Sequence, residues 1–223
     1  MSLHKVEVDF DKACLTKRDD VSFLELTGCG VEMNNEGIVA SGDFTGNIYL
    51  WKKEKRTPCA NVKAETSIRC LLWIDNVLLF GCLNSALYCW RYITQSNGPA
   101  VPLKYNKNLI QTLYNVFGDP VSMALDSTDT RLALGTTAGY LYVFDVKRTG
   151  DGLLHLEELY NLQIHEPKKQ EDGSLLVMEI WNVAWSVSDG YIATTSEDQT
   201  CKISESQTGL ISSYFFVLTV VVF

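Results

Sequence analysis

Catalysis requires particular residue types at particular spacings, and this sequence offers only three short candidates. They are two pairs of nearby carboxylates and one histidine beside a glutamate: Asp126 with Asp129, Glu197 with Asp198, and His165 with Glu166. Such pairs can act as general acid and base when their surroundings separate the two pKa values. Here each pair falls in a segment rich in Asp, Ser, Thr, Gly or Pro, which favours a solvated turn or loop. We therefore predict that all three pairs are exposed and non-catalytic.

Longer catalytic motifs are also missing from the sequence. It has no GxSxG, P-loop, HExxH or GxGxxG pattern, and the GCG segment at 28–30 lacks the strand–helix setting of a dinucleotide site. None of the seven cysteines forms a CxxC pair, and the three histidines, His4, His155 and His165, cluster with no cysteine pair. We predict no enzymatic activity, no small-molecule substrate, no cofactor and no metal.

The composition is that of a folded globular protein. Of the 223 residues, 46% are hydrophobic and 21% are charged, and the formal net charge is −8. An acidic balance disfavours nucleic-acid binding, which requires a basic surface. An odd number of cysteines without CxxC spacing is typical of reduced thiols, and the first residues do not resemble a signal peptide. We expect the protein in the cytoplasm or the nucleus.

A repeated unit organises the chain, and its form is clearest in the sequence RLALGTTAGYLYVF. Four copies can be aligned, at residues 38–51, 77–90, 131–144 and 191–204. Each has an apolar strand, a turn of small residues and a second strand, in which Leu141 and Val143 alternate with aromatic residues. Trp51 and Trp90, which end the first two copies, are separated by close to the roughly 40–45 residues of a propeller blade. One such unit cannot bury its apolar face alone, so the units must pack against one another.

The segments around these units favour further strands and turns. Strands are predicted at 6–10, 25–33, 67–73, 109–116, 121–125, 153–164 and 179–185. The polar segment 11–20 is predicted to be a loop, Asp75-Asn76 a two-residue hairpin turn, and 165–174 an exposed insertion. No segment has the pattern of a long amphipathic helix, so the predicted fold class is all-β.

The repeats resemble WD40 repeats, the blades of a β-propeller. The resemblance depends on ASGD and IYLW at 40–51, NVAWS and SDG at 182–190, and SEDQT at 196–200. In that family an aspartate in the turn bonds a histidine and helps to hold each blade together. Only Asp198 stands at the aspartate position, and no Gly-His precedes an inner strand at the family's spacing. The resemblance thus implies four-stranded blades, with this hydrogen-bond tetrad absent from at least three of the four.

The blade count predicts an incomplete ring. WD40 rings usually have seven blades, and only about four are recognisable here, at about 21–63, 64–117, 118–165 and 176–209 within a repeat region at 21–209. Residues 1–20 form an N-terminal segment whose first strand would, by the resemblance, close the ring. Residues 210–223 form an apolar tail that is too short to cross a bilayer as a helix. Two interpretations of the tail stay open: the end of a shortened isoform of a longer WD40 protein, or the outer strand of the fourth blade.

The resemblance predicts a non-catalytic scaffold that binds other proteins, as a subunit of a multiprotein complex. In the family's geometry, one face displays the turns within the repeats and the starts of the inner strands. The residues placed there are Phe44, Arg69, Leu83, Ser122, Thr137, Trp181 and Glu197. Phe44 and Trp181 are the strongest candidates, because aromatic side chains are enriched at interface hot spots. Trp181 could instead lie in the core between two blades.

Three other functions stay open at this point. The sequence FDVK at 144–147 loosely resembles the Trp-Asp-x-Arg ending found in substrate receptors of cullin-type ubiquitin ligases. The basic run at 52–56 could bind RNA phosphates, and the apolar tail could attach to a membrane. The acidic net charge disfavours RNA, and the length of the tail disfavours a membrane span.

Overall fold

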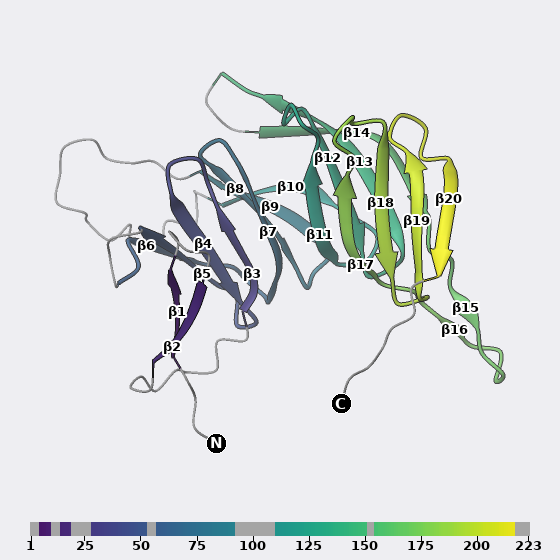
Figure 1. The fold of residues 1–223 in the computed structure, drawn as a ribbon, viewed down its shortest axis with the longest axis horizontal. Helices are drawn as coiled ribbons and strands as arrows, with labels where there is room; N and C mark the ends of the chain where they lie inside the picture. The colour runs from purple at the N-terminus through teal and green to yellow at the C-terminus, as the bar shows by residue number, and fades with distance from the viewer. Residues whose placement is uncertain are drawn as a thin grey trace.

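The computed structural model describes residues 5–9, 14–18, 28–52, 57–91, 110–150 and 154–216, and every regular element within these ranges is a β-strand (Figure 1). Most of these strands form four antiparallel sheets of four strands each, in chain order. We call these sheets blades 1 to 4. The structure thus has the predicted fold class, an all-β propeller of four-stranded blades that form an incomplete ring.

The strands of the four blades have the following bounds. Blade 1 comprises β3 (Gly28–Met33), β4 (Ile38–Asp43), β5 (Asn47–Lys52) and β6 (Ala60–Lys63). Blade 2 comprises β7 (Ile68–Ile74), β8 (Val77–Cys82), β9 (Ala86–Arg91) and β10 (Ile110–Asn115). Blade 3 comprises β11 (Pro120–Leu125), β12 (Arg131–Thr136), β13 (Tyr140–Arg148) and β14 (Leu154–Gln163). Blade 4 comprises β17 (Ile180–Trp185), β18 (Tyr191–Ser196), β19 (Thr200–Glu205) and β20 (Ile211–Phe216).

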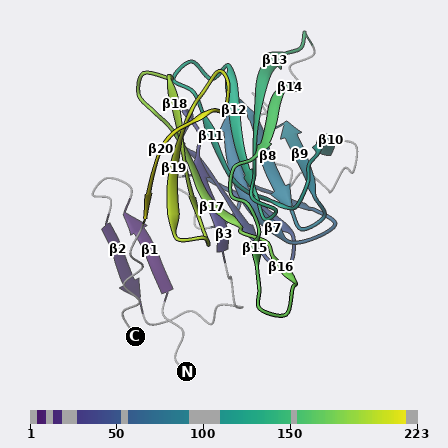
Figure 2. The same cartoon turned by 90° about the vertical axis from the view of Figure 1, so that its right-hand side faces the viewer.

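The four blades fan out from their first strands. The inner strands β3, β7, β11 and β17 contact one another in that order, and blades 1 and 4 lie at opposite sides of the view in Figure 1. Figure 2 shows the sheets overlapping side-on, as they do in a propeller seen across its axis. Arg69 at the start of blade 2 forms an ion pair with Glu179 just before blade 4, so the inner edges curve around a shared centre.

Both faces of the two middle blades are buried, which explains the alternation seen in the sequence. On β13, Tyr142 and Phe144 pack in one apolar cluster with blade 2, whereas Leu141 and Val143 pack in another cluster with blade 4. Trp90 likewise packs against blade 1. The aromatic residue that ends a repeat is therefore a wedge between its own blade and the preceding one, and it contributes apolar burial to their contact.

The local predictions are mostly confirmed, although the strands at 14–18, 60–63, 168–169 and 175–176 were not predicted. Asp75 has φ of 53° in the tight turn between β7 and β8, as predicted for a two-residue hairpin. The loop predicted at 11–20 is wrong in part, because β2 (Cys14–Arg18) lies there. It pairs with β1 (Lys5–Asp9) in a separate two-stranded sheet, and neither strand belongs to the sheet of a blade.

Two further segments add to the blades. The insertion after β14 contains a short hairpin of β15 (Lys168–Lys169) and β16 (Leu175–Leu176), with exposed residues around it. The tail predicted to begin at residue 210 pairs with β19 as β20, so its first part is the outer strand of blade 4. Residues 217–223 lie outside the described residues.

Candidate functional site

The antiparallel pairing brings the predicted binding residues to one end of the blades. Each inner strand begins opposite the end of its second strand, as where Ile68 pairs with Cys82 and Ile180 pairs with Ser196. The turn between the second and third strands therefore lies beside the start of the inner strand. We call this end the entry rim: the turns 44–46, 83–85, 137–139 and 197–199, with the segments that lead into β7, β11 and β17 and the first three residues of those strands. All seven predicted residues lie on it.

Side-chain hydrogen-bond acceptors and residues with a left-handed backbone conformation form the turns of the entry rim. In blade 1 the Asp43 carboxylate accepts hydrogen bonds from the backbone N–H groups of Thr45 (2.9 Å) and Asn47 (2.8 Å). Gly139 of blade 3 has φ of 77°, and a Cβ on it would lie 2.2 Å from the carbonyl oxygen of His165. Only glycine fits there, because both the conformation and the close approach exclude a side chain. The turns are thus held rigidly.

A buried hydrogen-bond network supports the rim in blade 4, and it overturns two predictions. His165 was predicted to lie exposed beside Glu166, but its side chain has no exposed surface. Its Nδ1 lies 2.8 Å from Asp198 Oδ2 and its Nε2 lies 2.9 Å from Thr194 Oγ1. Asp198, predicted to be solvated beside Glu197, is buried and also accepts a hydrogen bond from Thr200 Oγ1 (2.6 Å). Blade 4 thus has an aspartate–histidine pair, and the histidine comes from the loop before the blade.

The electrostatics of this network favour a neutral imidazole. Burial lowers the pKa of His165 below its ordinary value, although the neighbouring Asp198 opposes this shift. Burial by itself raises the pKa of Asp198, but hydrogen bonds from Thr200 and His165 bring it below its ordinary value. The order Thr194–His165–Asp198 resembles that of a nucleophile, a base and an orienting acid. Because all three side chains are buried, a substrate from solvent cannot reach them, and their role is structural.

Exposed apolar side chains gather on the entry rim. They come from the turns, from the loop before β11 and from the hairpin segment before β17: Phe44, Leu83, Phe117, Leu175, Leu176, Val177 and Trp181. Phe44 and Trp181 are each 50% exposed, and Phe117 is 68% exposed with its ring 5.5 Å from that of Tyr140. The exposure of Trp181 contradicts the alternative in which it belongs to the core. Large apolar side chains held open on rigid turns are typical of a protein-binding surface.

The polar residues predicted for the rim have structural partners instead. The guanidinium of Arg69 pairs with the carboxylate of Glu179, and both side chains are about three-quarters buried. Ser122 Oγ donates to Asn182 Oδ1 (2.9 Å) across the contact between blades 3 and 4.

The remaining two rim predictions, Thr137 and Glu197, also have backbone hydrogen bonds. Thr137 Oγ1 accepts from the backbone N–H of Asp119 (2.8 Å), and the backbone N–H of Glu197 donates to the carbonyl oxygen of Glu179 (3.0 Å). The Glu197 side chain itself is exposed. Only Phe44, Leu83, Trp181 and Glu197 among the seven thus offer an exposed side chain to a partner.

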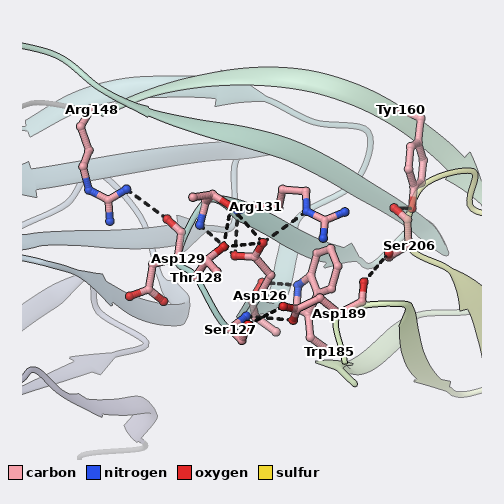
Figure 3. Close-up of polar contacts among 12 residues, drawn as sticks. Asp126, Ser127, Thr128, Asp129, Arg131, Arg148, Tyr160, Trp185, Asp189 and Ser206 are labelled. Carbon is pink, nitrogen blue, oxygen red and sulfur yellow. Dashed lines mark hydrogen bonds and ion pairs between the residues drawn. The ribbon is translucent and has the colours of Figure 1, made fainter. Parts of the chain in front are cut away.

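The opposite end of the blades holds a polar network, and it corrects the prediction for the pair Asp126 and Asp129. We call it the exit rim: the turns 34–37, 75–76, 126–130 and 186–190. Asp126, predicted to be solvated, is buried, where its carboxylate accepts from the backbone of Thr130 (2.8 Å) and pairs with Arg131 (3.2 Å; Figure 3). Hydrogen bonds that stabilise the carboxylate keep the pKa of Asp126 below its ordinary value, although burial alone raises it. This carboxylate therefore closes a turn.

The same end locks blade 3 to blade 4. The Arg131 guanidinium lies 4.8 Å from the ring centre of Trp185, whose Nε1 donates to the carbonyl oxygen of Ala124 (3.0 Å). The Asp189 carboxylate accepts from the backbone N–H of Ser127 (2.9 Å), as Figure 3 shows. These polar groups bind one another, so they are not free to recognise a partner.

The residues behind the alternative functions lie elsewhere. The segment 144–147 is inside β13, where Phe144 and Val146 are buried and Lys147 pairs with Glu157. Lys53 to Arg56 of the basic run lie outside the described residues. In the described ranges, no group of three His, Cys, Asp or Glu side chains is arranged to bind a metal, and no helix is long and apolar enough to span a membrane.

Part of the entry rim was not predicted from the sequence. Phe117 directly precedes Gly118-Asp119-Pro120, a turn sequence that could have marked it as an exposed residue before an inner strand. Leu175, Leu176 and Val177 follow a charged loop and gave no periodic signal. Glu179 could be linked to Arg69 only in three dimensions, because two blades separate them in sequence.

The fold and its rim define a class of protein: an incomplete β-propeller of antiparallel blades with one apolar rim. No model of a protein family matches the sequence, and a search of curated proteins finds no match. Among solved structures, a chain in "Crystal Structure of Mitotic Checkpoint Complex" matches with a TM-score of 0.67 and 15% identity. The match covers 96% of this chain and 61% of that chain. At this identity the likeness shows the fold, and 1533 chains match, so it does not by itself identify a partner.

Proposed function

We propose that this protein is a non-catalytic scaffold that binds other proteins through its entry rim, as a subunit of a multiprotein complex in the cytoplasm or nucleus. One observation carries the proposal: the exposed apolar side chains of the blade turns gather on the entry rim. In the four exit-rim turns the exposed large apolar side chain is Val187, and Met33, Tyr191 and Leu210 are exposed at the strand ends beside them. Apolar and aromatic side chains supply most of the binding free energy at protein interfaces. The likeness to a chain from a multiprotein complex agrees with this function.

The rim has the rigidity that a docking surface needs. Lys168 Nζ at the base of the hairpin donates to the carbonyl oxygen of Asp198 (3.2 Å), and Lys202 Nζ donates to that of Ile164 (2.7 Å). These contacts hold the loop before blade 4 on both sides of the His165 network. A surface that is ordered before binding loses less conformational entropy when a partner docks.

The chemistry of the rim defines the kind of partner. On this rim Trp181 and Phe117 present aromatic rings, and Leu175 presents an aliphatic side chain that is 65% exposed. A matching partner would pack apolar side chains against these residues. The Arg69–Glu179 ion pair lies beside them and would set the orientation of a polar group on the partner, because partly buried charges discriminate between partners.

The test compares single substitutions on the two rims. Trp181→Ala should lose partners that the wild-type protein retains in quantitative affinity purification, with a melting temperature close to that of the wild type. Val187→Ala on the exit rim is the matched control, because Val187 is fully exposed and lies in the turn that ends β17. Retention of every partner by Trp181→Ala combined with Phe117→Ala would rule out the entry rim as the docking surface.

A further inference from the structure

The three contacts between neighbouring blades share one steric device. The fifth residue of the second strand is a glycine in blades 1, 2 and 3, and the first residue of the next inner strand occupies the space beside it. A Cβ on Gly42 would lie 2.7 Å from Ile68, and one on Gly81 would lie 2.4 Å from Pro120. We call the glycine the seat and the residue that fills it the knob.

The contact between blades 3 and 4 repeats the device. A Cβ on Gly135 would lie 2.6 Å from Cγ2 of Ile180, the first residue of β17. The knob in all three contacts precedes a bulge in the inner strand, where the register shifts by one residue after Ile68, Pro120 and Ile180. The seat, the knob and the bulge are therefore equivalent features of each blade.

Blades 1 and 4, at the two ends of the series, each have one face that packs on none of the other three blades; we call these the open faces. On them the glycine and the larger residue exchange positions. The fifth residue of β18 in blade 4 is Thr195, so a side chain stands where the other blades have a seat. The first residue of β3 in blade 1 is Gly28, which also precedes a bulge, so blade 1 has a glycine where the other blades have a knob. Thr195 and Gly28 are thus complementary in position: blade 4 has a side chain where the other blades have the seat, and blade 1 lacks one where the other blades have the knob.

The rest of each open face is suited to contact with another blade. On blade 1 the face includes Val31 and Met33, 67% and 57% exposed, and Trp51, which stands where Trp90 wedges against a preceding blade. On blade 4 it includes Ile203 of β19 and Phe215 of β20, which strand pairing places on the same side of the sheet as Thr195. These residues are uncharged, and the charged residues that strand pairing places on the same faces, Glu205 of blade 4 and Lys63 of blade 1, have opposite signs. Two such faces can therefore approach without like-charge repulsion despite the net charge of −8.

We propose that the occupant of each open face is a second copy of this chain, with blade 4 of one copy packed on blade 1 of the other. The contact continues the interface that already joins blades 1 to 4 within one chain, with Thr195 as knob and Gly28 as seat. Two copies related by a two-fold axis use both open faces and leave none exposed. With four blades in each copy, the two copies together would make a closed ring of eight blades. Eight is the upper end of the range of roughly four to eight blades that propellers use.

The experiment exploits the reversal of the device. The wild-type chain should sediment at twice its monomer mass at micromolar concentration. Gly28→Ile places two side chains in one seat and should raise the dimer dissociation constant by about tenfold or more, because overpacking costs about 1–3 kcal/mol. Adding Thr195→Gly to Gly28→Ile recreates the internal pairing of Gly42 with Ile68 and should restore the dimer.

Controls separate this contact from misfolding. Ile already stands at the equivalent position of β7 and β17, so Gly28→Ile should leave the thermal transition of the monomer unchanged. Gly150→Ile, at a site where a Cβ meets nothing within 4 Å, should leave the dimer unchanged. A wild-type chain that stays monomeric at high concentration, or a partner of unrelated sequence that occupies the face instead, would overturn the proposal. So would a dimer insensitive to Gly28→Ile, a failure of the double variant to restore it, or assembly into trimers or open polymers.

Discussion

The buried hydrogen bonds of His165 should make it one of the most sensitive positions of blade 4. His165→Ala removes the hydrogen bonds of 2.8 Å to Asp198 Oδ2 and 2.9 Å to Thr194 Oγ1, and leaves these two buried oxygens without them, while Asp198 Oδ1 keeps its bonds from Thr200. An unsatisfied buried polar group costs about 1–3 kcal/mol, and a charged one costs more. Together with the cavity left by the imidazole, we expect the free energy of unfolding to fall by about 3–5 kcal/mol.

Equilibrium urea denaturation followed by tryptophan fluorescence measures this loss. His155→Ala is the control, because His155 lies on the exposed side of β14 and the substitution should change the free energy by less than about 0.5 kcal/mol. Thr194→Val, which removes only one of the two hydrogen bonds, should cost about 1–2 kcal/mol and keeps the test informative if His165→Ala does not fold. Equal and small losses for His165→Ala and His155→Ala would refute the role of the network.

The same network predicts a dependence of stability on pH. Burial lowers the pKa of folded His165 below its ordinary value of 6.5, so the unfolded chain takes up the proton first. The contribution of His165 to stability is therefore complete above pH 6.5 and declines as the pH falls below it, by at most about 1.4 kcal/mol per pH unit. Urea denaturation between pH 7.5 and 5 should show this slope in the wild type and in His155→Ala, and a weaker slope in His165→Ala. A slope unchanged by His165→Ala would contradict the argument.

Three substitutions test other contacts. Gly135→Val places a side chain where Ile180 of blade 4 packs, so it should lower the free energy of unfolding by about 1–3 kcal/mol, whereas Gly150→Ala should be nearly neutral. Equal losses of stability for the two variants in calorimetry would contradict the close packing of Ile180 on Gly135. Trp185→Phe removes the indole hydrogen bond and weakens the cation–π contact, and should cost about 1–2 kcal/mol in urea denaturation; a neutral result would discount both contacts. Asp75→Asn breaks only an exposed ion pair and keeps a side chain that tolerates positive φ, so a melting curve shifted by more than a few degrees would be unexpected.

Short-range patterns in the sequence predict much of the fold. The alternation in β13 predicts that Leu141 and Val143 face one way and Tyr142 and Phe144 the other, and these pairs pack in different clusters. The turn signal at Asp75 likewise predicts the hairpin between β7 and β8. Both succeed because period-two burial and left-handed turns depend on neighbouring residues alone.

The misses involve residues whose partners are distant or unusual in sequence. His165 was predicted to be exposed because its own segment is charged, whereas its burial depends on Asp198, 33 positions away. Asp126 looked like a solvated turn residue, but its carboxylate closes the turn from inside through Thr130 and Arg131. The binding role of the entry rim stays a prediction, because exposure identifies a surface and not the molecule that covers it.

Footprinting of an isolated complex can show whether a partner docks on the entry rim. Once a partner has been captured, hydrogen–deuterium exchange and hydroxyl-radical labelling of the free and bound protein report which rim the partner covers. Docking on the entry rim should protect the turn at 44–46, Phe117 and residues 175–181, and should leave the turns at 126–130 and 186–190 unchanged. Protection confined to the exit-rim turns, with Phe117 and Trp181 still fully labelled in the complex, would contradict it.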